Sequence, residues 1–155
     1  MGMAGKLQKE IRKIHPFESL EQEVFLNLIR TTDALGRDFE EYMKTLGLSA
    51  TQYNVLRILR GGGEAGYACR AVGQQMVTRD PDITRLMDRL EKRGLLRRER
   101  SATDRRVVMA RITEAGLALL AQMDAPVLAI HIRQLRHMGP EKLRLLSDLL
   151  EEARG

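Results

Sequence analysis

Cysteine and aromatic residues are scarce in this sequence: its 155 residues include one cysteine, three tyrosines, three phenylalanines and no tryptophan. The single cysteine, Cys69, excludes an intrachain disulfide and a cysteine-rich zinc site and fits a reducing cytoplasmic compartment. Residues 1–12 include basic side chains but lack the apolar segment of a secretory signal. No run of consecutive apolar residues approaches the ~18 to 20 that a membrane span needs. We therefore expect a cytoplasmic protein without membrane contacts.

The sequence also lacks the patterns that catalysis and metal binding require. No nucleophile, histidine and acid stand at catalytic spacing, and no glycine-rich phosphate loop follows a strand. The three histidines, His15, His131 and His137, do not share a helical face at ligand spacing. We therefore expect no enzymatic activity, no metal and no cofactor.

The charge of the chain is concentrated in one region. The net charge is +5. Residues 79–111 contain eleven basic and six acidic groups, whereas the rest of the chain has fifteen of each. Ten of the eleven basic groups are arginines, whose planar guanidinium suits phosphates and guanine edges. This cluster indicates a polyanionic partner; the alternative is a solvated helix face followed by an arginine-rich loop.

Apolar spacing predicts a long amphipathic helix near the N-terminus. Apolar residues recur at three-, four- and seven-residue steps from Phe17 to Leu46, with Pro16 at the first helical position and Gly47 at the end. A helix of about 30 residues is longer than a small core requires. Its surplus apolar length favours packing on a partner subunit.

Two shorter helices and then a basic one follow. Ser49 and Gln52 form a capping box for the first, which ends at the glycines 61–63. Cys69, Val72 and Met76 mark the buried face of the second. Asp80 is the expected N-cap of the third, Pro81 its first residue, and Gly94 its end; its apolar stripe is Ile83, Leu86, Met87 and Leu90. Two short helices joined by a tight turn, the second one basic, are typical of a helix-turn-helix.

The periodicity changes after Gly94. Residues 95–100 and 107–112 are strand candidates around a polar turn at 101–104, which predicts a hairpin. Thr113 can cap the next helix, in which we expect a kink at Pro126, and Gly139-Pro140 starts a last helix. The fold class is therefore mainly α with one small β-hairpin, in the order of a winged helix-turn-helix.

Three segments together resemble the MarR family of bacterial transcription regulators. Residues 80–98 are similar to the family's recognition helix and the entry to its wing, Thr103-Asp104-Arg105-Arg106 to the wing tip, and residues 112–116 to the exit from the wing. The resemblance covers residues 16–155 of a single MarR-like chain, 1–155. It implies a winged helix-turn-helix at 48–112 and a helical dimerisation region at 16–46 and 114–154.

The resemblance implies a homodimer that binds double-stranded DNA at a pseudo-palindromic operator, most often as a repressor, in the bacterial cytoplasm at the nucleoid. A small anionic or phenolic effector often releases such proteins; Tyr42, Tyr53, Arg57 and His15 are candidates for its crevice, whose position stays unknown. Two alternatives remain open: a non-specific architectural DNA-binding protein, and a redox-sensing regulator that uses Cys69. Since Cys69 falls on a core stripe, we favour a structural role for it.

The basic helix is expected in the major groove and the wing near the minor groove. Thr84 and Arg85 are expected at base edges, Arg89 and Lys92 at phosphates, and Arg106 in the minor groove with Asp104 bracing it. Asp82 either accepts from a cytosine amino group or holds Arg79 or Arg85, and we favour the second role. The complete set of expected DNA-binding residues is Arg79, Asp82, Thr84, Arg85, Arg89, Lys92, Arg98, Asp104, Arg105 and Arg106.

Overall fold

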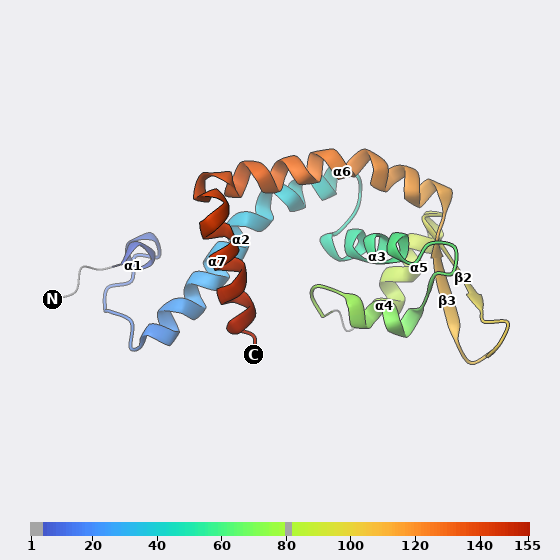
Figure 1. The fold of residues 1–155 in the computed structure, drawn as a ribbon, viewed down its shortest axis with the longest axis horizontal. Coiled ribbons are helices and arrows are strands. Elements are labelled where there is room, and N and C mark those ends of the chain that lie inside the picture. Colours follow the sequence, from blue (N-terminus) through green and yellow to red (C-terminus); the bar gives the residue numbers. More distant parts are fainter. Residues whose placement is uncertain (1–4, 80–81) are drawn as a thin grey trace. The chain divides into compact units, whose positions relative to one another are not determined.

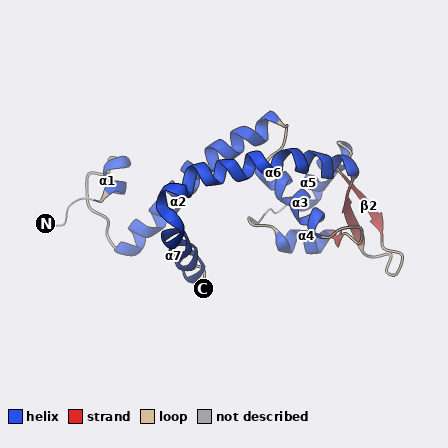
Figure 2. Ribbon diagram, turned by 45° about the horizontal axis from the view of Figure 1, so that its top comes forward, coloured by secondary structure: helices blue, strands red, loops and turns tan. Residues whose placement is uncertain are grey.

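The computed structural model describes residues 5–79 and 82–155. The chain divides into two compact units, residues 1–38 and 39–155, and each is described by itself. Helix α2, Leu20–Thr45, begins in the first unit and ends in the second. Among the described residues, helices dominate both units, and the strands belong to the second (Figures 1 and 2).

The first unit contains a short helix that the apolar spacing did not predict, α1 (Lys6–Glu10), followed by the start of α2. The expected start of the long helix at Pro16 is wrong, because α2 begins at Leu20. The Ser19 hydroxyl accepts the backbone N–H of Gln22 at 3.2 Å and so takes up one of the free amides of the first turn. The exposed apolar residues of this part of α2 are Leu20, Val24, Phe25, Leu28 and Ile29.

The second unit contains the predicted helices and hairpin. In chain order its elements are α3 (Ala50–Gly61), β1 (Tyr67–Ala68), α4 (Cys69–Gln75), α5 (Ile83–Lys92), β2 (Leu96–Arg100), β3 (Val108–Ile112), α6 (Glu114–Leu135), a 3₁₀ turn (Arg136–Met138) and α7 (Gly139–Glu152). Two of the three cap predictions are confirmed: Ser49 and Gln52 form the capping box of α3, and the Thr113 hydroxyl accepts the N–H of Gly116. Helix α6 runs through Pro126 without interruption.

The sheet has one strand more than the predicted hairpin. Its order is β1-β3-β2, and both pairs are antiparallel. Strand β1 pairs Tyr67 with Ala110 and Ala68 with Met109, so the middle of β3 is paired on both sides. A two-residue strand carries no periodic signal of its own, and its partner lies far along the chain.

The core lies between α3, α4, α5, the sheet and the first half of α6 (Figure 1). Its fully buried side chains include Leu56, Leu59, Val72, Met87, Leu90, Leu96, Leu120 and Met123. Gly116 sits where α6 leaves the sheet: a Cβ there would come within 2.3 Å of the Leu95 carbonyl oxygen. The base of the wing and the start of α6 therefore approach each other as closely as backbones can.

Much of the apolar surface of α6 and α7 is not covered by the chain itself. Leu117, Leu128, Ile132, Leu145 and Leu149 are exposed. By length and composition alone the segment Glu114–Glu152 could cross a membrane, and only 28% of its most apolar window is buried. Gln122, Asp124 and His131 interrupt that window, which is why the sequence has no unbroken apolar run there.

Candidate nucleic-acid interface

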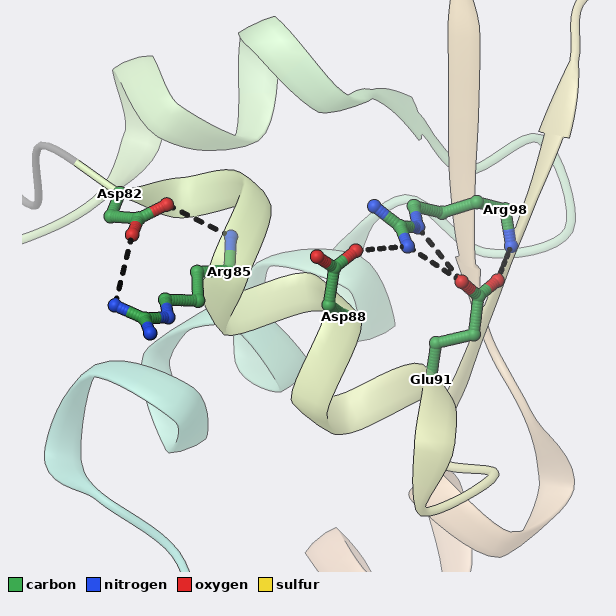
Figure 3. Close-up of polar contacts among 5 residues, drawn as sticks. All are labelled: Asp82, Arg85, Asp88, Glu91 and Arg98. Atoms are coloured by element: carbon green, nitrogen blue, oxygen red, sulfur yellow. Dashed lines mark hydrogen bonds and ion pairs between the residues drawn. The ribbon is translucent and has the colours of Figure 1, made fainter.

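Helix α5 begins at Ile83, and its cap is Asp82. The cap expected at Asp80 and the helical start expected at Pro81 fall on residues outside the described part of the chain. The Asp82 carboxylate accepts the backbone N–H of Arg85 at 3.1 Å, and its other oxygen lies 4.0 Å from the Arg85 guanidinium (Figure 3). Both side chains are more than half exposed, so this pair orients Arg85 without removing it from the surface.

The two faces of α5 differ as the apolar spacing predicts. Leu86, Met87 and Leu90 are buried in the core, and Ile83 is partly buried against it. The other face is exposed and carries the expected DNA-binding residues Thr84, Arg85, Arg89 and Lys92. Arg79, which precedes the helix, is exposed as well. The exposed face of α5 therefore carries cations and a hydroxyl on a single helix, and the major groove of DNA is wide enough to admit one helix.

The tip of the wing is held by its own polar groups. The Asp104 carboxylate accepts the backbone N–H of Arg106 at 3.0 Å, and Arg100 donates to the Arg105 carbonyl at 2.7 Å. The Ser101 N–H donates to the Val107 carbonyl at 2.9 Å and closes the hairpin. Asp104 thus braces Arg106 through its backbone. The side chains of Arg105 and Arg106 are exposed, so the tip presents two cations on an ordered turn.

Arg98 stands apart from the other expected DNA-binding residues. Its guanidinium donates to Glu91 from Nε at 3.0 Å and to Asp88 from Nη2 at 2.5 Å, and only 20% of the side chain is exposed (Figure 3). Hydrogen bonds from Arg98 hold the pKa of Glu91 below its ordinary value. The Nε and Nη2 atoms of Arg98 are thus engaged with carboxylates of α5 and not directed at the exposed face of that helix.

Arg93 is a residue whose role the sequence did not reveal. Its two terminal nitrogens donate to the carbonyl oxygens of Gly47 at 2.7 Å and Leu46 at 3.0 Å. These carbonyls follow α2, and the guanidinium therefore ties the C-terminal end of α5 to the connection before α3. No sequence signal pairs these positions, because the contact spans 46 residues.

A second cluster of polar groups joins α3 to α6. Arg60 donates two hydrogen bonds to Asp124, at 2.8 and 3.0 Å, and these bonds lower the pKa of the Asp124 carboxyl. Arg57 lies 4.0 Å from Asp124 and donates to the Tyr53 hydroxyl at 3.0 Å. The Tyr53 ring contacts Phe39, which in turn stacks on His131. Of the proposed effector residues, Tyr53 and Arg57 therefore lie together.

Cys69 is half-buried and packs against the core. Burial raises the pKa of its thiol, which disfavours the reactive thiolate. Within residues 5–79 and 82–155, no three histidine, cysteine or acidic side chains group as metal ligands. His15 and His137 are exposed.

Comparisons with known proteins agree on one family. The family-wide sequence model of the MarR family matches residues 48–108. A MarR transcription factor from Planctomyces limnophilus is 44% identical, with 87% of this chain and 98% of that one covered and a TM-score of 0.68. The regulator MhqR of Bacillus subtilis is 27% identical over 83% of this chain and 88% of its own length. NadR in complex with 4-hydroxyphenylacetate is 27% identical, with 90% and 97% covered and a TM-score of 0.71.

Proposed function

The chain belongs to the MarR family of transcription regulators, and from this membership we propose that it is a homodimeric repressor of a pseudo-palindromic operator, released by a small anionic or phenolic ligand. The family and the relatives are regulators of transcription and not enzymes. Such regulators act in the cytoplasm, and binding to chromosomal DNA would place this one at the nucleoid.

One observation carries the proposal: the exposed cations of α5 and those of the wing tip belong to one folded unit. Helix α5 presents Thr84, Arg85, Arg89 and Lys92 opposite its buried stripe. In a DNA complex Thr84 and Arg85 would read base edges in the major groove, while Arg89 and Lys92 would contact phosphates. Arg106 would enter the neighbouring minor groove, and Arg105 and Arg79 would add phosphate contacts. Asp82 and Asp104 would orient the cations beside them.

The uncovered apolar surface supports a dimer. Leu128 and Ile132 of α6 and Leu145 and Leu149 of α7 are all more than half exposed, and large apolar residues exposed in number on two helices are typical of an interaction site. A second copy is a better occupant than lipid, because the first half of α6 buries Leu120 and Met123 in the core of the winged unit. Insertion in a membrane would take that half of the helix out of the core.

Ligand release would act through the polar cluster between α3 and α6. NadR, a relative, binds 4-hydroxyphenylacetate, which has a phenol and a carboxylate. Arg57 and the Tyr53 hydroxyl offer a cation and a phenol in the same neighbourhood. A ligand that favours a dimer with the wrong half-site separation would lower the affinity for DNA.

The test is binding of the whole protein to a pool of randomised duplex DNA at moderate salt, followed by sequencing of the bound fraction. The proposal expects an inverted repeat with half-site centres about one helical turn apart. Binding without sequence enrichment would instead indicate an architectural DNA-binding protein, with affinity that falls steeply with salt. Added 4-hydroxyphenylacetate should then be screened as the first phenolic acid for loss of binding.

A further inference from the structure

Arg98 makes the densest set of polar contacts between the wing and helix α5. Its backbone N–H donates to Glu91 Oε1 at 2.8 Å, and its Nη2 atom donates to Glu91 Oε2 at 2.6 Å and to Asp88 Oδ1 at 2.5 Å. Asp88 and Glu91 are three residues apart, so they lie on the same side of the helix. One guanidinium therefore holds two consecutive turns of α5 against strand β2 (Figure 3).

Arg98 differs from the other ion-paired arginines by the number of its partners and not by its burial alone. Its side chain is 20% exposed, close to the 22% of Arg111, but it contacts two carboxylates, which are themselves 47% and 37% exposed. A planar guanidinium shared between two carboxylates constrains direction as well as distance. The cluster therefore adds a side-chain constraint on the direction of β2 beyond the backbone junction at Leu95.

That direction matters because the wing extends beyond the cluster. Strand β2 ends at Arg100, and the tip carries Arg105 and Arg106. Each strand residue adds about 3.3 Å, so the tip begins roughly 13 Å beyond Arg98, and a rotation of about 10° there would move it by ~2 Å. Contacts in two adjacent grooves can form together only if the wing and α5 keep one mutual orientation.

We propose that Arg98 is a positioning residue that does not itself contact DNA. It locks the wing to the recognition helix in one mutual orientation, so that both elements can enter their grooves at the same time. The proposal rests on the proposed function of the chain. Arg98, which the sequence places among the DNA-binding residues, is thereby assigned the role of aligning the wing with α5.

Three variants separate alignment from charge. Arg98→Gln removes the guanidinium contacts and one positive charge, while the backbone N–H of residue 98 keeps its donor to Glu91. Arg97→Gln removes the same charge from the neighbouring residue, which is exposed and alternates to the other face of β2. The double variant Glu91→Gln/Arg98→Gln keeps the net charge of the natural chain but lacks the lock. Circular dichroism at the assay temperature confirms that each variant is folded.

The first readout is affinity for the inverted-repeat duplex recovered from the randomised pool. Arg98→Gln and the double variant should both bind about tenfold more weakly, while Arg97→Gln should lose only the few-fold effect of one charge. Recovery of the natural affinity in the double variant would overturn the proposal, because charge alone would then explain the loss.

The second readout assigns the loss to one groove. Dimethyl sulfate methylates guanine N7 in the major groove and adenine N3 in the minor groove, the two acceptors that distinguish the grooves. In Arg98→Gln, at saturating protein, protection of adenine N3 under the wing should fall while protection of guanine N7 under α5 persists. Parallel loss of both would overturn the proposal, since Arg98 would then only support the fold.

A third readout needs no DNA and separates this inference from the proposed function. Nitroxide labels at Ala102→Cys and Lys92→Cys, in a Cys69→Ser background diluted with unlabelled protein, report the distance from the wing tip to α5 within one chain. Arg98→Gln should broaden the distance distribution, and Arg97→Gln should leave it narrow. Equal widths would overturn the proposal whatever the DNA selection shows; a broadened distribution with no operator recovered would uphold the lock and reject only the regulator.

Discussion

The base and the tip of the wing use the same side chain for opposite purposes. At the base, the Arg98 guanidinium is largely buried between two carboxylates of α5. At the tip, Arg105 and Arg106 are exposed, and the polar contacts around them hold the backbone of the turn. The number of basic residues in a segment therefore indicates how strongly it attracts a polyanion. It does not indicate which of those side chains are free to contact one.

The base is also where the backbone is most constrained. A Cβ at Gly116 would meet the Leu95 carbonyl oxygen at 2.3 Å and the Ile112 side chain at 2.6 Å. Changes that crowd the backbone at the base should therefore alter folding first, and changes at the tip should alter binding alone. The following variants test that division.

Gly116→Ala should have the largest effect, a loss of about 3 kcal/mol in the free energy of unfolding, because the buried methyl group forces the Leu95 carbonyl and α6 apart. Chemical denaturation measures it. Gly61→Ala is the matched control, since nothing lies within 4 Å of the added Cβ. Equal stability of the two variants would show that the base can relax.

Arg106→Ala should weaken operator binding by about tenfold to a hundredfold, since one minor-groove and phosphate contact is worth ~1 to 3 kcal/mol. Its thermal midpoint and dimer mass should stay those of the natural chain, because the side chain is exposed. Arg97→Ala serves as control for the loss of charge. Unchanged affinity at fixed salt would remove the wing tip from the interface.

The elements that the sequence predicts correctly are those determined by residues close together along the chain. The capping box of Ser49 and Gln52, the cap at Thr113 and the apolar stripe of α5 depend on residues within one or two turns. The pairing of Tyr67 with Ala110 and the contact of Arg93 with Gly47 join distant positions, and no periodicity records them. The sequence places Arg98 at the DNA because its charge is visible there, whereas the packing of β2 on α5 that engages its Nε and Nη2 atoms is not.

Gly73→Ala should stabilise the winged unit by about 0.5 to 1 kcal/mol, because alanine is the better helix former and limits the unfolded chain. The position is exposed within α4, and the added Cβ would lie 4.0 Å from Ile83, an ordinary contact. Denaturation of the variant beside the natural chain measures the gain. A loss of stability would mean that α4 packs more tightly than these distances indicate.

Low pH should weaken the contacts at the base of the wing. The pKa of Glu91 is lowered in the folded chain, so its ion pair contributes stability above the unfolded pKa of about 4.3. That contribution disappears as pH falls through the still lower folded value. Because Glu91 is partly exposed, we expect Glu91→Gln to reduce the acid-induced loss by only a few tenths of a kcal/mol. Identical pH profiles of unfolding would contradict this.

Cys69→Ser should leave the response of DNA binding to peroxide unchanged, the smallest effect of the series. Burial raises the pKa of this thiol, and the neutral thiol reacts slowly with peroxide. Gel-shift titrations with and without peroxide compare the two proteins. A response that the natural chain shows and the variant lacks would establish the redox alternative.

The closing hydrogen bond of the hairpin, from the Ser101 N–H to the Val107 carbonyl, has an evolutionary consequence. Residues 102–106 lie outside the ladder, and exposed loop tips tolerate insertion and deletion. Descendants of this chain can therefore lengthen, shorten or recharge the tip while the frame beneath it stays intact. Substitutions at the wing tip can therefore change the operator preference of such descendants without reducing the stability of the fold.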